Sequence, residues 1–168
     1  MARTQILVIG HNDKGCLQAH LDAAYETGRL IAEHGAILVT GGMGGVMRAA
    51  SRGAREAGGI SVGIVPQNDA SMANEFCDIV VPTGVGLMRD FMNVYSADGI
   101  IIVGGGAGTL SEMCAAYMHG KRMVAIRGTG GMADRYAGEY LDHRKSVMVE
   151  GADSPSDAIR RIFEIIAS

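Results

Sequence analysis

The sequence predicts a single α/β domain with a Rossmann-like arrangement, in which a parallel β-sheet is flanked by helices on both faces. Short, continuous β-branched runs recur along the chain, and segments with apolar residues at helical spacing alternate with them. The 25 glycines show no fixed period but cluster at the ends of these runs. Continuous apolar runs suit strands covered on both faces, and alternation of strand and helix gives parallel strands with right-handed crossovers. A chain of 168 residues fits one such domain, over residues 1–168.

The expected elements follow one another from the first apolar run, "QILVIG", to the end of the chain. The strand candidates span residues 5–10, 36–40, 60–65, 78–82, 99–104, 122–127 and 146–150. The segments with apolar residues at helical spacing span residues 17–34, 45–57, 86–97, 109–119 and 155–167. Ligands of such folds bind outside the carboxyl ends of the strands, where the connecting loops gather. The loops after the strands are therefore the expected place for a site.

Charge and cysteine content exclude several classes of function. The net charge is −3, with 15 basic and 18 acidic side chains spread along the chain, so no basic stripe for nucleic acid is present. Cys16, Cys77 and Cys114 follow neither a disulfide nor a zinc spacing. The histidines are scattered, and no long apolar segment follows the N-terminus. We expect a cytoplasmic protein with no metal, no resident cofactor, no nucleic-acid partner and no membrane partner.

Two glycine loops are the strongest functional feature of the sequence. "VTGGMGGVM" and "IVGGGAGTLSE" each leave a strand candidate and enter a helix candidate, about sixty residues apart. Glycines there let the backbone approach an anion, which then faces the N–H groups and the positive dipole end of the helix. Tight strand-to-helix turns without any ligand are the structural alternative. The predicted phosphate-binding residues are Gly41, Gly42, Gly44, Gly45, Gly105, Gly106, Gly108 and Thr109.

The form of the two loops narrows the class of ligand. Neither loop continues into Gly-Lys-Ser/Thr, so the P-loop of nucleoside triphosphatases is absent. The GxGxxG spacing fails as well, because Met47 and Thr109 stand where the last glycine is required. The next strand ends in "IVPQND" and offers no acidic residue at its tip to bind a ribose diol, as a dinucleotide site would need. A triphosphatase and an NAD-binding fold are both disfavoured.

Arg89 and Glu112 are the candidate catalytic residues, and each has a structural alternative. Arg89 falls in the first turn of a predicted helix, where the dipole disfavours a cation, so it needs an anionic partner or a bound phosphate unless it is a solvated surface side chain. Thr109 and Glu112 match a capping box, which requires no chemistry. A glutamate one turn inside a phosphate loop would also lie near an attached sugar, where it could stabilise developing positive charge.

The paired stretches "RDFMNVYSAD" and "GGGAGTLSE" resemble the signature of the Lonely Guy (LOG) proteins, which are also labelled lysine decarboxylases. The resemblance spans about residues 5–150 and includes "TGGMGGVMRAAS" as the first loop. The matching positions are Arg89, Ala97, Asp98, Gly105, Gly106, Gly108, Thr109 and Glu112. It implies a Rossmann-like homodimer that hydrolyses the N-glycosidic bond of nucleoside 5′-monophosphates, with the arginine and the glutamate taking part in the chemistry.

Two positions depart from that family's pattern. Asp90 stands where the family has lysine, and Gly104 stands where it has proline. The short chain and its loop variants look closer to a neighbouring branch that resembles the algal molybdenum-cofactor carrier protein. Two hypotheses therefore remain: a phosphoribohydrolase that uses Arg89 and Glu112, or a non-catalytic carrier of a phosphorylated ligand such as a nucleotide or molybdenum cofactor.

Methionines at helical spacing in the ranges 86–97 and 109–119 predict a contact between copies of the chain. Such residues fill cores or subunit interfaces more often than they form ligand sites. Apolar faces on these two helices would pair across a two-fold axis, so a homo-oligomer, dimer or tetramer, is expected.

Overall fold

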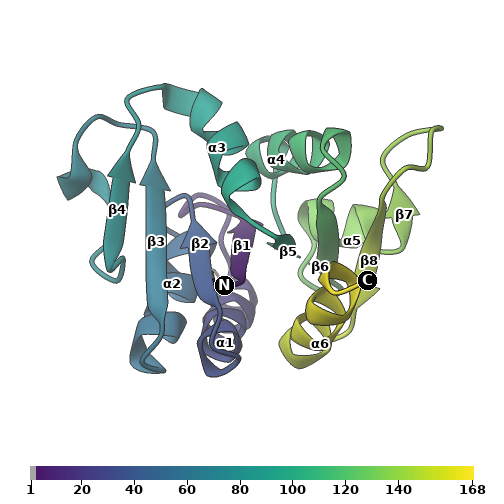
Figure 1. The fold of residues 1–168 in the computed structure, drawn as a ribbon, viewed down its shortest axis with the longest axis horizontal. Helices are drawn as coiled ribbons and strands as arrows, with labels where there is room; N and C mark the ends of the chain where they lie inside the picture. Colours follow the sequence, from purple (N-terminus) through teal and green to yellow (C-terminus); the bar gives the residue numbers. More distant parts are fainter. Residues whose placement is uncertain (1–2) are drawn as a thin grey trace.

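The fold is built around an eight-stranded sheet, in the order β4-β3-β2-β1-β5-β6-β8-β7 (Figure 1). The computed structural model describes residues 3–168, so residues 1 and 2 of the predicted domain lie outside the described range. The strands are β1 (Gln5–Gly10), β2 (Ile37–Thr40), β3 (Ile60–Val65), β4 (Ile79–Pro82), β5 (Gly99–Val103), β6 (Arg122–Ile126), β7 (Glu139–Tyr140) and β8 (Met148–Ala152). Neighbouring strands are parallel, apart from the antiparallel pair β7 and β8.

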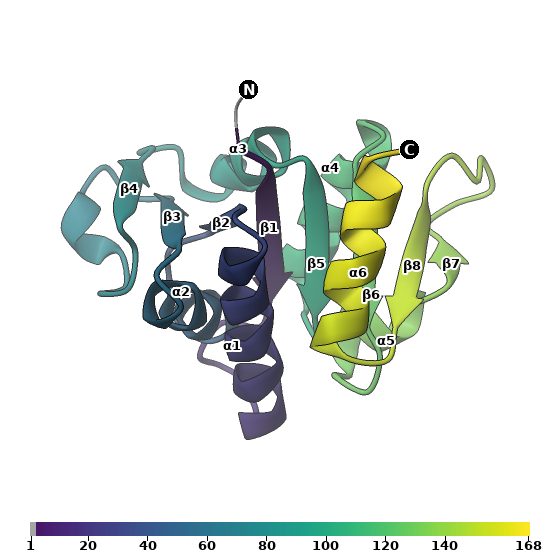
Figure 2. The same cartoon turned by 60° about the horizontal axis from the view of Figure 1, so that its bottom comes forward.

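Helices cover both faces of this sheet (Figure 2). One face carries α1 (Gln18–Glu33), α2 (Val46–Glu56) and α6 (Pro155–Ile166), and the other carries α3 (Arg89–Ser96), α4 (Ala107–Met118) and α5 (Gly131–Tyr136). Two single 3-10 turns, η1 (Ala70–Met72) and η2 (Gly86–Met88), lie in the connections. The predicted fold class, a Rossmann-like parallel sheet flanked by helices on both faces, is confirmed.

The central strand shows why the apolar runs are continuous rather than alternating. Along β1, Ile6 and Val8 are buried against the α1, α2 and α6 layer, whereas Leu7 and Ile9 are buried against the α3, α4 and α5 layer. Successive side chains of a strand point to opposite faces. Both faces of β1 are therefore core, and each position must be apolar.

Close packing of α1 on α2 depends on two glycines. A Cβ atom at Gly28 would lie 2.0 Å from the Ala50 carbonyl oxygen, and one at Gly53 would lie 2.0 Å from the Tyr25 carbonyl oxygen. The two helix backbones therefore touch directly where they cross. This contact holds the start of α2 beside the loop that follows β1.

Several element boundaries differ from the expectation. Helix α4 begins at Ala107, two residues before the predicted start, and the predicted helix over 86–97 divides into η2 and α3. Helix α5 and strand β7 were not predicted. They are six and two residues long, too short for a periodicity signal, and β7 exists only because it pairs with β8 at the sheet edge.

The strand order places a crevice between β1 and β5. From β1 the chain proceeds to β2 on one side, and from β5 it proceeds to β6 on the other side. The loops after β1 and β5 therefore diverge and leave a crevice at the carboxyl edge, where doubly wound sheets bind ligands. Over residues 3–168, no helix combines the length and apolarity needed to cross a bilayer.

The helix crossing predicts that Gly28→Ala destabilises the protein by about 1–3 kcal/mol, because the added methyl group meets backbone that cannot move aside. Urea unfolding followed by circular dichroism measures this loss. Gly108→Ala is the matched control, since no heavy atom lies within 4 Å of a Cβ at Gly108 in α4. Equal stability of the two variants would contradict the close contact.

Candidate functional site

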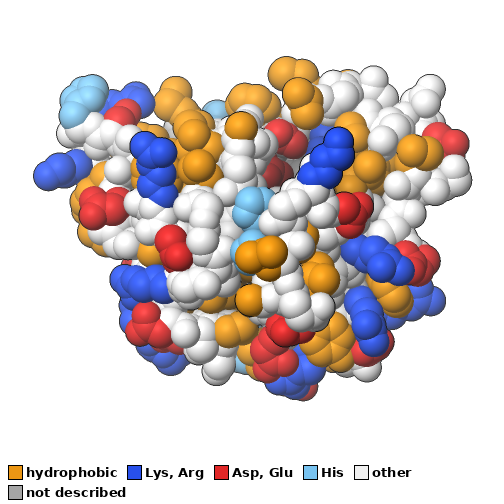
Figure 3. Space-filling view, turned by 180° about the vertical axis from the view of Figure 1, so that it is seen from behind, with side chains coloured by type: hydrophobic (Ala, Val, Ile, Leu, Met, Phe, Trp, Pro, Cys, Tyr) orange, Lys and Arg blue, Asp and Glu red, His pale blue; other side chains and the backbone are white. Residues whose placement is uncertain are grey.

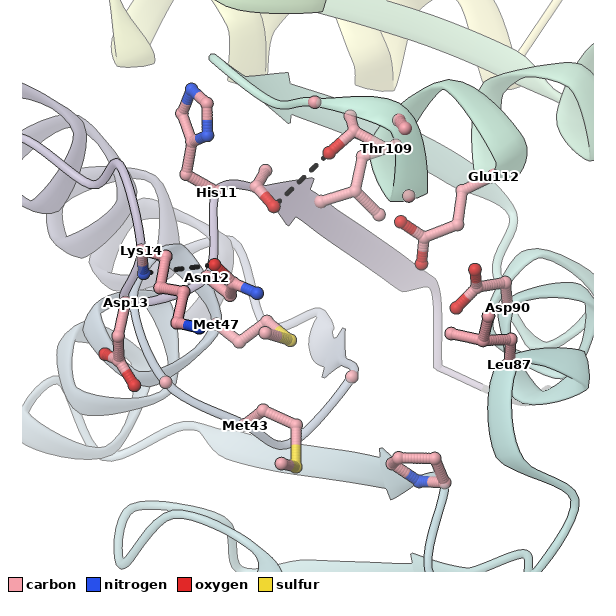
Figure 4. A pocket seen from close by; sticks show the side chains of 18 of the residues that line it. His11, Asn12, Asp13, Lys14, Met43, Met47, Leu87, Asp90, Thr109 and Glu112 are labelled. Atoms are coloured by element: carbon pink, nitrogen blue, oxygen red, sulfur yellow. Dashed lines mark hydrogen bonds between the residues drawn. The ribbon is translucent and has the colours of Figure 1, made fainter.

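The crevice contains a cavity of about 690 Å³ that four segments of the chain enclose. The segments are the loop after β1, the loop after β2, the start of α3 and the start of α4. Figure 4 shows Lys14, Met43 and Met47 on one side and Asp90 and Glu112 on the other. In the space-filling view of Figure 3, histidine side chains lie near the centre of the face, beside a recess in which acidic side chains are visible.

The second glycine loop presents unused hydrogen-bond donors to this cavity. Helix α4 begins at Ala107, after Gly106 as N-cap, and no side chain caps it. Leu110 N donates to the Gly106 carbonyl, but among the described residues Ala107, Gly108 and Thr109 have no acceptor for their N–H groups. All three line the cavity. A helix start of this kind combines free N–H groups with the positive end of the dipole, which suits an anion.

The first glycine loop is used differently, because the chain supplies its own anion. Asp13 Oδ1 accepts a hydrogen bond of 2.8 Å from Gly45 N, and the His11 carbonyl accepts one of 2.9 Å from Val46 N. A Cβ atom at Gly44 would lie 2.0 Å from Asp13 Oδ2. The start of α2 therefore holds a carboxylate in the place expected for a phosphate.

The predicted binding residues are only partly brought to the cavity. Its wall contains Gly41, Gly44, Gly106, Gly108 and Thr109. Gly42, Gly45 and Gly105 are not in the wall, and each has a positive φ, of +70°, +61° and +102°. These three glycines shape the turns, because the left-handed conformation is costly for other residues.

The capping box predicted for Thr109 and Glu112 is wrong. Because α4 starts at Ala107, Thr109 lies inside its first turn, and its Oγ1 donates to the Gly10 carbonyl over 3.3 Å. Glu112 is 8% exposed and accepts a hydrogen bond of 3.0 Å from Asn93 Nδ2. The threonine thus ties α4 to β1, and the glutamate faces α3 and the cavity rather than the helix start.

Glu112 and Asp90 form a buried acidic pair at the cavity wall (Figure 4). The pKa of Glu112 is raised to about 8, chiefly by burial; the hydrogen bond from Asn93 and the charge of Arg89 oppose this rise, and the charge of Asp90 adds to it. Burial also raises the pKa of Asp90, while the neighbouring Arg89 lowers it. Burial and the repulsion between two neighbouring carboxylates both favour the neutral form of Glu112.

Arg89 begins α3 and reaches across the cavity floor to the first glycine loop. Its Nη1 donates to the Gly41 carbonyl over 2.8 Å and to the Ile64 carbonyl over 3.2 Å. Its Nε lies 3.3 Å from Asp90 Oδ1 but is not aligned for a hydrogen bond. Asp90 is therefore the anionic partner that was expected for Arg89 at the start of a helix. The guanidinium also supports the wall of the cavity. A direct contact of Arg89 with a ligand stays a prediction.

Gly104 cannot be a proline in this structure. Its φ is +61°, which the proline ring forbids, and its N–H donates to Thr129 Oγ1 over 2.9 Å. A Cβ atom there would lie 2.7 Å from His11 Cδ2. Glycine in place of the proline of the LOG pattern therefore allows both the hydrogen bond to Thr129 and the close approach of the His11 ring.

The His11 ring packs beside the ring of a second histidine, His20. His20 Nδ1 accepts from Leu17 N over 2.9 Å, so its Nε2 carries the hydrogen donated to the Thr129 carbonyl at 2.7 Å. The His11 and His20 rings lie 4.8 Å apart, and burial together with His20 lowers the pKa of His11. A neutral imidazole therefore borders the cavity above the second glycine loop.

The segment after β1 is the part of the site that the sequence argument missed. His11, Asn12, Asp13 and Lys14 all line the cavity, although the scattered histidines gave no sign of a site in the sequence. The available signal was their position directly after an apolar strand in a doubly wound fold. Within residues 3–168, no cluster of three or more histidine, cysteine, aspartate or glutamate side chains is arranged to hold a metal ion.

Comparison with known proteins places this site in a family. The model described as the SLOG cluster4 family matches residues 3–159. The chain belongs to the SLOG cluster4 family. An uncharacterised protein of Archaeoglobus fulgidus is 42% identical to this member over 127 residues, which cover 76% of this chain and 82% of that protein.

Two solved structures are similar to this SLOG cluster4 protein over nearly its whole length. The molybdenum cofactor binding protein of Rippkaea orientalis has 34% identity and a TM-score of 0.87, with 99% of each chain covered. The molybdenum cofactor carrier protein of Chlamydomonas reinhardtii has 32% identity and a TM-score of 0.86, covering 99% of this chain and 100% of that one. These matches agree with the predicted likeness to the carrier branch, whereas none of them names the LOG hydrolases or a lysine decarboxylase.

The buried carboxyl of Glu112 predicts a pH-dependent stability difference. Since its folded pKa of about 8 lies above the ordinary 4.5, the unfolded chain releases the proton first as pH rises. The wild type should lose stability relative to Glu112→Gln between about pH 4.5 and 8, by up to about 1.4 kcal/mol per pH unit, with a constant difference above that window. Urea unfolding at pH 5, 7 and 8.5 measures it. The exposed Glu139→Gln is the control, and a pH-independent difference for Glu112→Gln would contradict the burial.

Proposed function

We propose that this protein binds a phosphorylated pterin-type cofactor, of which molybdenum cofactor is the representative, and carries it without cleaving it. The phosphate would lie at the start of α4, and the rest of the ligand would extend along the cavity between the two glycine loops. The similarity to the molybdenum cofactor carrier protein of Chlamydomonas reinhardtii and to the molybdenum cofactor binding protein of Rippkaea orientalis supports this proposal. A cytoplasmic location, expected from the sequence, is part of the same proposal.

The free N–H groups of Ala107, Gly108 and Thr109 are the observation on which the proposal rests. They face a cavity of about 690 Å³, within the usual range for small-molecule sites. The equivalent helix start of α2 already holds the Asp13 carboxylate, which shows that this type of helix start in this fold stabilises an anion. Lys14 lines the same cavity and adds a cation for a phosphate group. The residues present therefore fit a phosphorylated ligand.

The hydrolytic hypothesis, with Arg89 and Glu112 as catalytic residues, stays a prediction that the comparisons do not support. Arg89 donates to two backbone carbonyls, so its Nη1 is already occupied. With a pKa of about 8, Glu112 is largely protonated at neutral pH and then lacks the negative charge that would stabilise an oxocarbenium-like transition state. Both features favour binding over cleavage.

The binding proposal predicts that the protein retains molybdenum cofactor through gel filtration. The wild type is mixed anaerobically with cofactor released from a molybdoenzyme, and bound molybdenum and pterin are then quantified. Gly108→Asp should lower the affinity by about tenfold or more, because its carboxylate repels the phosphate, although an acidic residue suits a helix start. Gly108→Ala adds a side chain without charge and should bind as the wild type does.

Two outcomes would contradict the carrier proposal. One is equal retention of molybdenum cofactor by Gly108→Asp and Gly108→Ala, which would show that the phosphate does not bind at the start of α4. The other is release of adenine from AMP by the wild type at a rate that Glu112→Gln abolishes. That result would favour the hydrolytic hypothesis instead.

We also propose that the protein is a homo-oligomer, a dimer or a tetramer, assembled through an apolar surface on η2, α3 and α4. Hydrophobic side chains gather along the upper edge of Figure 3, over α3 and α4. The exposed members of this surface are Leu87 (83%), Met88 (62%), Met92 (42%), Tyr95 (50%) and Met118 (64%). Contiguous apolar surfaces of this kind mark interaction sites more often than free surface.

The oligomer proposal predicts that Met92→Glu shifts the protein to a smaller assembly, because a charge would be buried in the contact. Size-exclusion chromatography with light scattering at micromolar concentration measures the mass. Met72→Glu is the control, since Met72 is 49% exposed on η1, outside this surface. A monomeric wild type would refute the proposal.

A further inference from the structure

Two carboxyl groups of the cavity wall, Asp90 and Glu112, and the Asn93 side chain buried behind them form a polar group that we call the carboxyl floor. Their exposed fractions are 6%, 8% and 0%. Asp90 and Asn93 come from α3, and Glu112 comes from α4. Figure 4 shows the carboxyl groups of Asp90 and Glu112 directed toward one another at the edge of the cavity. The binding proposal above assigns no role to this group.

Hydrogen-bond acceptors outnumber donors on the carboxyl floor. Asn93 Nδ2 donates to Glu112 Oε1, but among the described residues Asn93 Oδ1 accepts from no donor. Asp90 accepts no aligned hydrogen bond, although Arg89 Nε lies 3.3 Å away. The carboxylate of Asp90 therefore has no aligned donor among the described residues.

Unpaired buried acceptors are costly, and natural proteins pair nearly all of them. Arg89 Nη1 is occupied by the Gly41 and Ile64 carbonyls, and Arg89 Nε lies 3.3 Å from Asp90 Oδ1 without the alignment of a hydrogen bond. Lys14 lies on the far side of the cavity from Asp90 (Figure 4). Asp90 and Glu112 line the cavity, so N–H groups of a ligand there can pair with their oxygens, whereas a further anion would be repelled.

We propose that the carboxyl floor recognises the adjacent N–H groups of a 2-amino-4-oxo-pyrimidine ring, the edge that guanine and pterins share, and so selects this class of base. The inference rests on the proposed function, because it assigns the other end of the same ligand. Asp90 is the specificity-determining residue. Glu112 completes the acceptor surface beside it, and Asn93 positions Glu112 through its hydrogen bond to Oε1.

The chemistry of the ring edge matches the floor. The amino group and the adjacent ring N–H are two parallel donors, which a carboxylate accepts as a pair. Adenine offers one donor beside an acceptor, and its acceptor would face the carboxylate oxygens. A site whose buried polar groups are left unpaired rejects the analogue strongly.

The remaining walls suit a flat ring in this orientation. Met43, Met47 and Leu87 line the cavity with apolar groups, and thioethers pack well on aromatic faces. A phosphate near Asp90 and Glu112 would be repelled, whereas the start of α4 attracts it. The ligand is thereby oriented with its phosphate at α4 and its ring at the floor. This orientation also explains an aspartate at position 90, where the LOG pattern has lysine.

Calorimetric titration with GMP, IMP and AMP tests the assignment, because these ligands share ribose and phosphate and differ in the ring edge. We expect GMP to bind about tenfold or more tightly than IMP, which lacks only the amino group, and than AMP. In Asp90→Asn, the ratio of GMP to IMP affinity should fall toward one. Asp153→Asn, whose side chain is 79% exposed, should leave the ratio unchanged.

Each other outcome overturns the assignment. Equal affinity of the wild type for the three monophosphates would show that the floor does not recognise the base; if Gly108→Asp abolished that binding, the phosphate site would still stand. Absence of GMP binding would refute the floor even if molybdenum cofactor is retained. Should Asp90→Asn fail to fold, the order of the three ligands on the wild type decides the question alone.

Discussion

The end of β1 at Gly10 is the constraint on which the site depends. A Cβ atom there would lie 2.2 Å from the Val103 carbonyl oxygen and 2.9 Å from the Val46 side chain, so only glycine fits between β5 and α2. The Gly10 carbonyl accepts from Thr109, and the next carbonyl accepts from Val46 N. One backbone segment thus joins the starts of α2 and α4. The distance between the two glycine loops, and with it the cavity, follows from this contact.

The two helix starts are alike in sequence but unlike in electrostatic state. At α2 the Asp13 carboxylate accepts the Gly45 N–H and the His11 carbonyl accepts the Val46 N–H, so the chain itself supplies an anion to this helix start. At α4 the first N–H groups have no acceptor among the described residues, so a ligand anion gains hydrogen bonds that the empty protein lacks. A similar asymmetry exists between the two ends of the cavity, since donors gather at α4 and acceptors gather at Asp90 and Glu112. Such a polarised cavity orients a ligand that has an anionic end and an N–H end.

The positions that depart from the LOG pattern are each matched by a neighbour in space. Gly104 has a conformation closed to proline, and its N–H and bare Cα are used by Thr129 and the His11 ring. Asp90 lies beside the guanidinium of Arg89, which in turn holds the Gly41 carbonyl. Gly41 must lack a side chain for this to occur, because a Cβ atom would lie 1.7 Å from Arg89 Nη1. Each departure therefore fits the contacts that surround it.

The sequence by itself determined the layered fold and the general place of the site, because both depend on local signals. Continuous apolar runs identify strands buried on both faces, and glycines at strand ends identify the loops that approach a ligand. The tertiary structure alone decided which of those loops receives a carboxylate from the chain itself. The carboxylate of Asp13 lies 32 positions from Gly45 along the chain, and the partner of Glu112 lies on another helix. The residue spacing of Thr109 and Glu112 predicted a cap that the fold does not make, because the helix begins two residues earlier and buries the glutamate against α3. Burial and pairing between distant segments set the charge of a side chain, and no local pattern contains that information.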